Sequence, residues 1–121
     1  MAKVMVVDDE KNVVELLDFL LMKDGYEVIN AFNGREAISL AAQQKPDLIL
    51  LDIMMPGIDG YTVYNTLQQD PATNKIPVII LTAKGRMRDV FAMAKNIVAY
   101  IEKPFDPKML RESVRAVLIK K

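Results

Sequence analysis

The sequence has no cysteine, no histidine and no tryptophan among its 121 residues. Without cysteine the chain can form neither a disulfide bond nor a thiolate metal site, which fits a reducing compartment. Without histidine it lacks the commonest general base and the commonest transition-metal ligand, so any metal should be a hard cation bound by oxygen. No apolar stretch approaches the roughly 20 residues of a membrane span, and the N-terminal apolar run is too short for a signal peptide. We therefore expect a cytoplasmic protein.

The chain also lacks an excess of either charge, because 16 Lys and Arg residues balance 16 Asp and Glu residues. This balance gives no indication of binding to nucleic acid or to an anionic membrane. With 51% hydrophobic residues, the chain can fill one substantial core. Its length is typical of one domain, and we expect that domain to span residues 1–121.

Short apolar runs alternate along the chain with segments of helical periodicity. The runs are typical of strands that are buried on both faces. The expected strands are 4–7, 26–30, 48–51, 78–81 and 97–101, and the expected helices lie around 13–21, 37–41, 61–67, 87–94 and 109–118. This order predicts an α/β fold of (βα)5 type, in which a parallel five-stranded sheet carries helices on both faces.

Polar side chains follow four of the five expected strands. Asp8 and Asp9 come after the first strand, Asp52 after the third, Thr82 after the fourth and Lys103 after the fifth. Ligand sites in parallel sheets lie beyond the carboxyl ends of the strands. We therefore expect these five residues to line one site.

Three clustered carboxylates need compensation, because each pair about 4 Å apart costs about 4 kcal/mol at an effective dielectric constant near 20. Three compensations are open: a raised pKa that leaves one carboxyl neutral, the charge of Lys103, or a bound divalent cation. A site with a few oxygen ligands suits Mg²⁺. Taken alone, residues 8–10 are equally typical of a helix N-terminus, and we interpret Glu10 as a charge in the first turn of that helix.

A carboxylate in such a site can act as a nucleophile towards phosphorus and form an aspartyl-phosphate. Asp52 is the candidate nucleophile, with Mg²⁺ holding the phosphoryl oxygens. Lys103 would neutralise another oxygen, and the Thr82 hydroxyl would hydrogen-bond a third. Each residue alone has a simpler interpretation, as a loop acid, a surface lysine or a strand-end hydroxyl. Their joint placement favours the phosphoryl site.

Four segments at the strand ends resemble the receiver domain of two-component response regulators, with a fold like that of the chemotaxis regulators: residues 6–10, 50–60, 80–84 and 100–105. The resemblance implies the flavodoxin-like strand order 2-1-3-4-5. It also implies that Asp52 accepts phosphate from a phosphohistidine on a sensor kinase or phosphotransfer protein. The implied Mg²⁺ ligands are Asp8, Asp9 and Asp52, together with the backbone carbonyl of Met54.

The resemblance further implies a switch controlled by phosphorylation. Thr82 would move towards the phosphoryl group and Tyr100 would turn inward, which biases an equilibrium between two states. The surface that changes is formed by the fourth expected helix, the fifth strand and the last helix, and it would contact an output domain or partner protein. The chain is thus expected to be a signalling module and not an enzyme, apart from slow self-phosphorylation and dephosphorylation.

The sequence departs from the family at residues 96–99, where Asn-Ile-Val-Ala stands in place of the common Gly-Ala-Asp-Asp. The missing acids put in doubt the salt-bridged dimer of the winged-helix transcription factors in this family. We expect most of the apolar stretch at 97–99 to be buried, although it could form a partner patch. The peptide between Lys103 and Pro104 is expected to be cis, as it usually is in the family. The alternative function is that of a phosphate-independent pseudo-receiver, which would be expected to lack one of the acids, the threonine or the lysine.

Overall fold

The computed structural model describes residues 2–53, 60–83 and 96–119. Within them lie five strands and four helices: β1 (Lys3–Val7), α1 (Lys11–Lys23), β2 (Glu27–Ala31), α2 (Gly34–Gln44), β3 (Leu48–Asp52), α3 (Gly60–Gln69), β4 (Val78–Ala83), β5 (Ile97–Lys103) and α4 (Pro107–Leu118). The helix expected at 87–94 lies outside the described residues, as does Met54. No helix in the described part is both long enough and apolar enough to cross a membrane.

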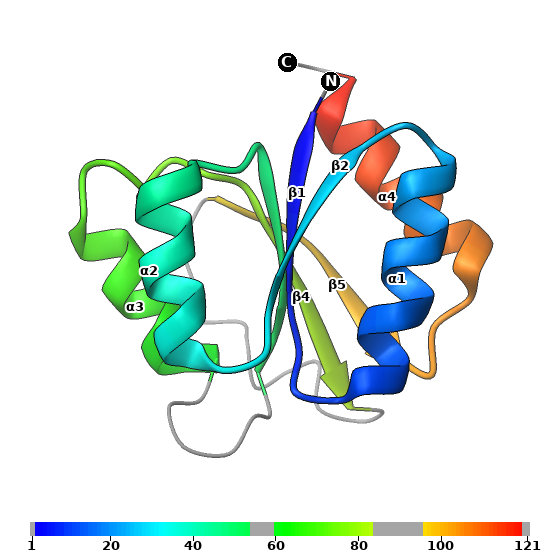
Figure 1. Ribbon diagram of the computed structural model, residues 1–121, viewed down its shortest axis with the longest axis horizontal. Helices are drawn as coiled ribbons and strands as arrows, with labels where there is room; N and C mark the ends of the chain where they lie inside the picture. Colours follow the sequence, from blue (N-terminus) through cyan, green and yellow to red (C-terminus); the bar gives the residue numbers. More distant parts are fainter. Residues whose placement is uncertain (1, 54–59, 84–95, 120–121) are drawn as a thin grey trace.

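The strands form one parallel sheet in the order β2-β1-β3-β4-β5. Helices α2 and α3 cover one face of the sheet, and α1 and α4 cover the other (Figure 1). The predicted α/β fold and its strand order 2-1-3-4-5 are therefore confirmed.

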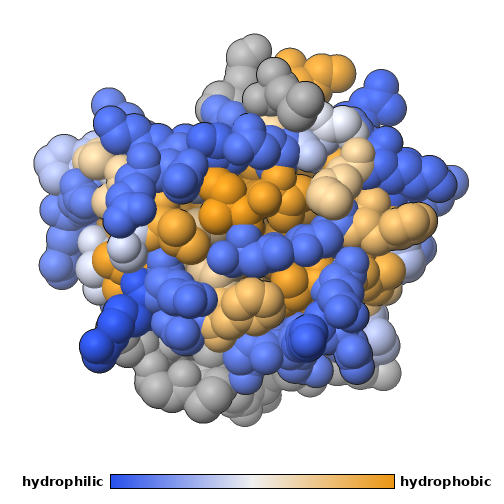
Figure 2. All heavy atoms as spheres, viewed as in Figure 1, coloured by the Kyte–Doolittle hydropathy of each residue, from blue (hydrophilic) through white to orange (hydrophobic). Residues whose placement is uncertain are grey.

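The central strands are apolar along most of their length because both of their faces are covered. In β1, Met5 and Val7 pack into the core beneath α2 and α3, while Val4 and Val6 pack into the core beneath α1 and α4. The edge strand β2 is less protected, and three of its five residues are only partly buried. Figure 2 shows apolar atoms reaching the surface on the side where β2 runs between α1 and α2.

The first turn of α3 packs directly onto the end of β3. The backbone N–H of Gly60 donates to the carbonyl oxygen of Ile53 at 3.3 Å. A Cβ atom at Gly60 would lie 2.7 Å from the carbonyl oxygen of Asp52 and would also overlap Cα of Ile53. Only glycine allows this close approach, which holds the backbone of Asp52 and Ile53 against the start of α3.

The edge strand β5 carries the apolar stretch that departs from the family pattern. Ile97 and Ala99 are partly buried and pack against the two cores, as expected. Val98 is 47% exposed, so the burial expected for most of this stretch does not extend to this residue. The reason is an irregularity in the β4–β5 register: Val78 pairs with Ile97 and Ile79 with Ala99, so Val98 is an extra residue between these two pairs.

Candidate functional site

Three carboxylates meet at the carboxyl ends of β1 and β3. These two strands are adjacent, with Val7 opposite Leu51, so Asp8 and Asp52 leave the sheet side by side. One carboxylate oxygen from each of Asp8, Asp9 and Asp52 lies within 4.8 Å of the others. Asp8 is fully buried and Asp52 is 3% exposed, whereas Asp9 is exposed. The cluster predicted from the sequence is therefore present, with its outer member open to solvent.

Lys103 reaches this cluster from the end of β5. Its Nζ lies 2.7 Å from Oδ2 of Asp8 and 3.2 Å from Oδ2 of Asp52. A third carboxylate, that of Glu10, approaches the same Nζ at 3.3 Å through Oε1. A lysine ammonium has three N–H donors, and three carboxylates match them in number. The peptide between Lys103 and Pro104 is cis, as the family resemblance implied.

The burial of these charges shifts two pKa values. Burial raises the pKa of Asp8, and the charge of Asp52 adds to this shift, although hydrogen bonds from Lys103 and from the backbone N–H of Glu10 act in the opposite direction. For Lys103, burial acts to lower the pKa, but the hydrogen bond to Asp8 and the charges of Asp52 and Asp8 outweigh it, so the pKa is raised. Lys103 thus balances part of the negative charge of the acids, and burial moves the pKa of Asp8 in the direction that favours a neutral carboxyl.

The donor set also fits a hard divalent cation. Every candidate ligand in the cluster is a carboxylate oxygen, and one member, Asp9, faces solvent, from which water ligands can complete a coordination shell. Soft or transition metals prefer sulfur or imidazole ligands, and the chain has neither cysteine nor histidine. The site could thus hold a cation such as Mg²⁺.

Thr82 lies on β4, the strand next to β3, and Tyr100 lies on the edge strand β5. Thr82 is fully buried near the end of β4, one residue beyond the partner of Asp52 in the β3–β4 register. It pairs with Glu102, directly before Lys103. Tyr100 is partly buried on β5 and packs against the core beneath α2 and α3. Both residues are therefore on the sheet at or near the rim that carries the acids.

A family model described as "Response regulator receiver domain" matches residues 4–115. The chain belongs to the response regulator receiver domain family. It is 39% identical to Protein PilH of Pseudomonas aeruginosa over 119 residues, which make up 98% of each chain. Other curated relatives are longer than this receiver domain, and the match covers only 26% of one of them and 49% of another.

Solved structures of other receiver domains have the same fold. A crystal structure described as a response regulator from Chloroflexus aurantiacus J-10-fl superposes with a TM-score of 0.89, 35% identity and 98% coverage of each chain. The receiver domain of sensor histidine kinase PA1611 from Pseudomonas aeruginosa PAO1 superposes with a TM-score of 0.86, 25% identity and 97% coverage of each chain. That structure is described as having a magnesium ion coordinated in its active site cleft.

Glu10 has a different position in the receiver domain from the one expected. It was interpreted as a charge in the first turn of the helix, but α1 begins at Lys11 and Glu10 is the residue before it. Its side chain makes no capping hydrogen bond to the helix and instead approaches Lys103. Sequence reasoning missed this contact because the two residues are separated by 93 positions, and no local pattern signals such a pair.

An apolar groove of about 500 Å³ adjoins the acidic cluster. Its walls come from the start of α1 and from the segment after β5: Glu10, Asn12, Val13, Leu16, Lys103, Pro104 and Phe105. Further along α1, Phe19 and Met22 are 64% and 58% exposed. The mouth of the site is thus continuous with an exposed apolar surface on α1.

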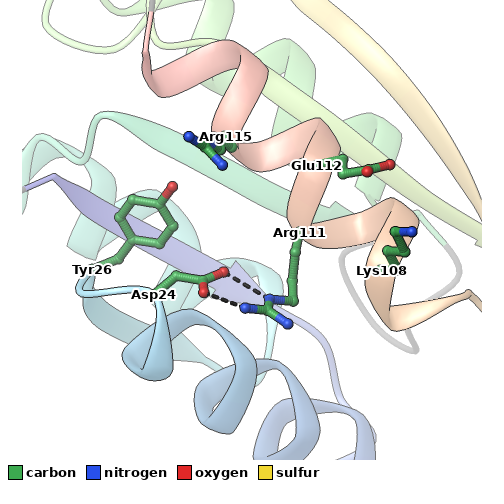
Figure 3. A pocket seen from close by; sticks show the side chains of 6 residues that line it. All are labelled: Asp24, Tyr26, Lys108, Arg111, Glu112 and Arg115. Carbon is green, nitrogen blue, oxygen red and sulfur yellow. Dashed lines mark hydrogen bonds and ion pairs between the residues drawn. The ribbon is translucent and has the colours of Figure 1, made fainter.

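A second pocket, of about 290 Å³, lies between the C-terminal end of α1 and helix α4 (Figure 3). Its lining is mostly charged: Asp24, Tyr26, Lys108, Arg111, Glu112 and Arg115. Arg111 donates two hydrogen bonds to the carboxylate of Asp24, at 2.9 Å and 2.6 Å. Because Asp24 precedes β2, this pocket lies at the opposite end of the sheet from the acidic cluster, and none of its residues belongs to that site.

Proposed function

We propose that this receiver domain is the phosphoacceptor module of a two-component phosphorelay, with Asp52 as the residue that is phosphorylated. The observation that carries the proposal is the position of Lys103, whose ammonium bridges the buried carboxylates of Asp8 and Asp52. A cation between two acids at the strand ends is the arrangement that transfer of an anionic phosphoryl group requires.

The donor is a phosphohistidine on a sensor kinase or phosphotransfer protein. A carboxylate oxygen of Asp52 attacks phosphorus, and the bond from phosphorus to the histidine nitrogen breaks. The electron pair of that bond goes to the imidazole, which carries a proton on its other nitrogen and leaves as a neutral ring. The carboxylates of Asp8, Asp9 and Asp52, with the carbonyl of Met54, would hold Mg²⁺, which reduces the repulsion between the two anions when it is bound. The module turns over slowly, by self-phosphorylation and dephosphorylation, and does not act as an enzyme on other substrates.

The phosphorylated form would be held by Lys103 and Thr82. The ammonium of Lys103 would hydrogen-bond one phosphoryl oxygen and the hydroxyl of Thr82 another. Movement of Thr82 towards the phosphoryl group leaves space into which Tyr100 turns, so the packing of β5 changes. The altered surface includes β5 and α4 with the segment between β4 and β5, and it controls an output domain or partner protein.

The apolar groove beside Lys103 supports a docking position for the donor protein. A phosphohistidine must approach Asp52 through the mouth of the site, and apolar side chains of α1, among them the exposed Leu16, line the groove beside that mouth. A donor that covers them buries apolar area and excludes water from the reacting groups.

The test is intact mass spectrometry after incubation with Mg²⁺ and acetyl phosphate. A single phosphoryl adduct is expected for the wild-type chain and none for Asp52→Asn or for a sample without Mg²⁺. An adduct that persists in Asp52→Asn contradicts the assignment of Asp52. No adduct from either acetyl phosphate or a phosphorylated histidine donor indicates a pseudo-receiver instead. A urea unfolding curve shows whether Asp52→Asn is folded, which we expect because the two side chains have nearly the same shape.

A further inference from the structure

The contact between Glu10 and Lys103 has no part in the phosphotransfer chemistry proposed above. The Asp8 and Asp52 side chains that share the ammonium are 0% and 4% exposed, whereas that of Glu10 is 62% exposed. A buried carboxylate that loses its cation partner pays a large desolvation cost, while an exposed one is readily solvated. Of the three acceptors on Lys103, Glu10 is therefore the one that can be released at the smallest cost.

The carboxylate of Glu10 is available for Lys103 because it does not cap the helix. Glu10 occupies the N-cap position of α1 with an extended backbone, and its side chain accepts no hydrogen bond from the first turn. Its backbone N–H donates to Oδ1 of Asp8 at 2.9 Å, a bond that any residue except proline would make. Substitution of Glu10 thus removes the contact with Lys103 and leaves the backbone support of Asp8 in place.

Phosphorylation of Asp52 would create a competitor for the same ammonium. All three N–H donors of Lys103 are matched by carboxylates in this structure, so a phosphoryl oxygen receives one when a partner gives way, either the exposed Glu10 or the Asp52 oxygen, whose charge is lost on phosphorylation. A phosphoryl group also repels the nearby Glu10 carboxylate, which weakens the same contact from the other side. Both effects favour an exchange of Glu10 for the phosphoryl oxygen.

We propose that Glu10 is a positioning residue that holds the Lys103 ammonium in the unphosphorylated domain and yields it to the phosphoryl group. This inference rests on the proposed function, because it assigns to Glu10 the regulation of the same site. It makes Glu10 a brake on phosphorylation, since the Glu10–Lys103 ion pair competes with the phosphoryl oxygens for the ammonium. The freed carboxylate then stands in the wall of the groove beside α1, where it adds an unpaired negative charge to the surface that the donor has just used.

The experiment compares the rate of phosphorylation by acetyl phosphate in Glu10→Gln, Glu10→Asp, Glu15→Gln and the wild-type chain. In this reaction an oxygen of Asp52 attacks phosphorus and acetate leaves with the electron pair of the broken bond. We expect Glu10→Gln to react faster than wild type by on the order of two- to fivefold, the size of effect typical of a partly exposed ion pair. Glu15 is an exposed acid on the same helix, so Glu15→Gln makes the same change in charge away from Lys103 and should leave the rate unchanged.

Glu10→Asp separates the hold on Lys103 from simple repulsion of the anionic donor. Aspartate keeps the charge but is one methylene shorter, and the wild-type contact is already at 3.3 Å, so the ion pair should be lost. The proposal expects Glu10→Asp to react faster than wild type, as Glu10→Gln does. A rate for Glu10→Asp equal to that of wild type, or a rate for Glu10→Gln equal to that of Glu15→Gln, overturns it.

A second measurement does not depend on phosphorylation and keeps the two proposals distinguishable. The ammonium protons of Lys103 should exchange slowly enough in the wild-type domain to give a nitrogen-detected NMR signal, and this signal should broaden in Glu10→Gln and Glu10→Asp but not in Glu15→Gln. If no chain is phosphorylated, the proposed function fails while this comparison still decides whether Glu10 holds Lys103. An identical Lys103 signal in all four chains rejects the inference about Glu10, whatever the phosphorylation result.

Discussion

Replacement of Lys103 with methionine removes the cation that two buried carboxylates share. The carboxylate oxygens of Asp8 and Asp52 lie within 4.8 Å of each other, so their repulsion is about 3 to 4 kcal/mol at an effective dielectric constant near 20. In other proteins, removal of one partner from a buried ion pair lowers the free energy of unfolding by about 3 to 5 kcal/mol. The two values agree, and we expect the free energy of unfolding of Lys103→Met to fall by about 3 kcal/mol at neutral pH without Mg²⁺.

The loss in free energy of unfolding caused by Lys103→Met should grow as pH rises. Burial raises the pKa of Asp8 in the folded domain, and removal of Lys103 takes away a hydrogen bond that opposes this shift. Between the unfolded and the folded pKa, the native state binds more protons than the unfolded state, so stability falls as pH rises through this window. The free energy of unfolding of the variant should therefore be closest to that of wild type at the acid end of this window, where Asp8 is protonated, and furthest from it above the window.

Urea unfolding at pH 7 and near pH 5 measures this difference, with and without Mg²⁺. Mg²⁺ should recover more stability in Lys103→Met than in wild type, because the variant has lost its internal cation. Lys108→Met is the matched control, since Lys108 is exposed on α4 and its loss should change the free energy of unfolding by less than about 0.5 kcal/mol. The reasoning is refuted if Lys103→Met is as stable as Lys108→Met at pH 7, or if its deficit is the same at both pH values.

Two further predictions concern the stability of the fold, one at the end of β3 beside the site and one at the opposite end of the sheet. Gly60→Ala should lower the free energy of unfolding by about 1 to 3 kcal/mol and slow phosphorylation of Asp52, because the new Cβ overlaps the backbone at the end of β3. Gly25→Ala is the control: no atom lies within 4 Å of its new Cβ, but its φ of +90° is strained for alanine, so the free energy of unfolding should fall by about 1 to 2 kcal/mol. The rate of phosphorylation should stay unchanged in Gly25→Ala, and an equal slowing of phosphorylation in both variants would contradict this contrast. A hydrogen bond from Arg111 lowers the pKa of Asp24 (Figure 3), so this pair stabilises the fold above the unfolded pKa and the effect is lost as pH falls through the folded pKa. The free energy of unfolding of Asp24→Asn should accordingly be lower than that of wild type at neutral pH, and the two values should converge in strong acid. A difference in free energy that stays constant with pH would show that the ion pair is not its cause.

The arrangement of the site was predictable wherever it depends on the direction of the strands. Parallel strands bring their carboxyl ends to one rim, so residues far apart in the chain, such as Asp8, Asp52 and Lys103, could be placed together from the sequence alone. The predicted ends of the strands were less accurate, because the hydrogen bonds between the strand backbones continue past the last apolar residue. Lys103 and Thr82 lie within β5 and β4, although both were expected to follow their strands.

The partner of Glu10 could not be predicted because local pattern and tertiary contact disagree at this position. An acid just before a helix is typical of favourable interaction with the helix N-terminus, and nothing nearby in the sequence suggests another partner. Lys103 comes from β5, which lies three places away from β1 in the sheet. Whether its ammonium reaches Glu10 depends on the position of that strand and on the length of the lysine side chain. Such a contact follows from side-chain reach, for which a single sequence carries no signal.

The three compensations that the sequence left open are not independent of one another. Lys103 engages Oδ2 of both Asp8 and Asp52, the same two carboxylates that would hold a divalent cation. A bound cation lowers the pKa of a nearby carboxyl, so it would oppose the shift that burial imposes on Asp8 and keep that residue charged. The lysine would then be held less tightly by the acids and more available to a phosphoryl oxygen. Charge balance at this rim therefore links metal binding to the freedom of Lys103, and Glu10 is the exposed group through which that freedom can be tuned.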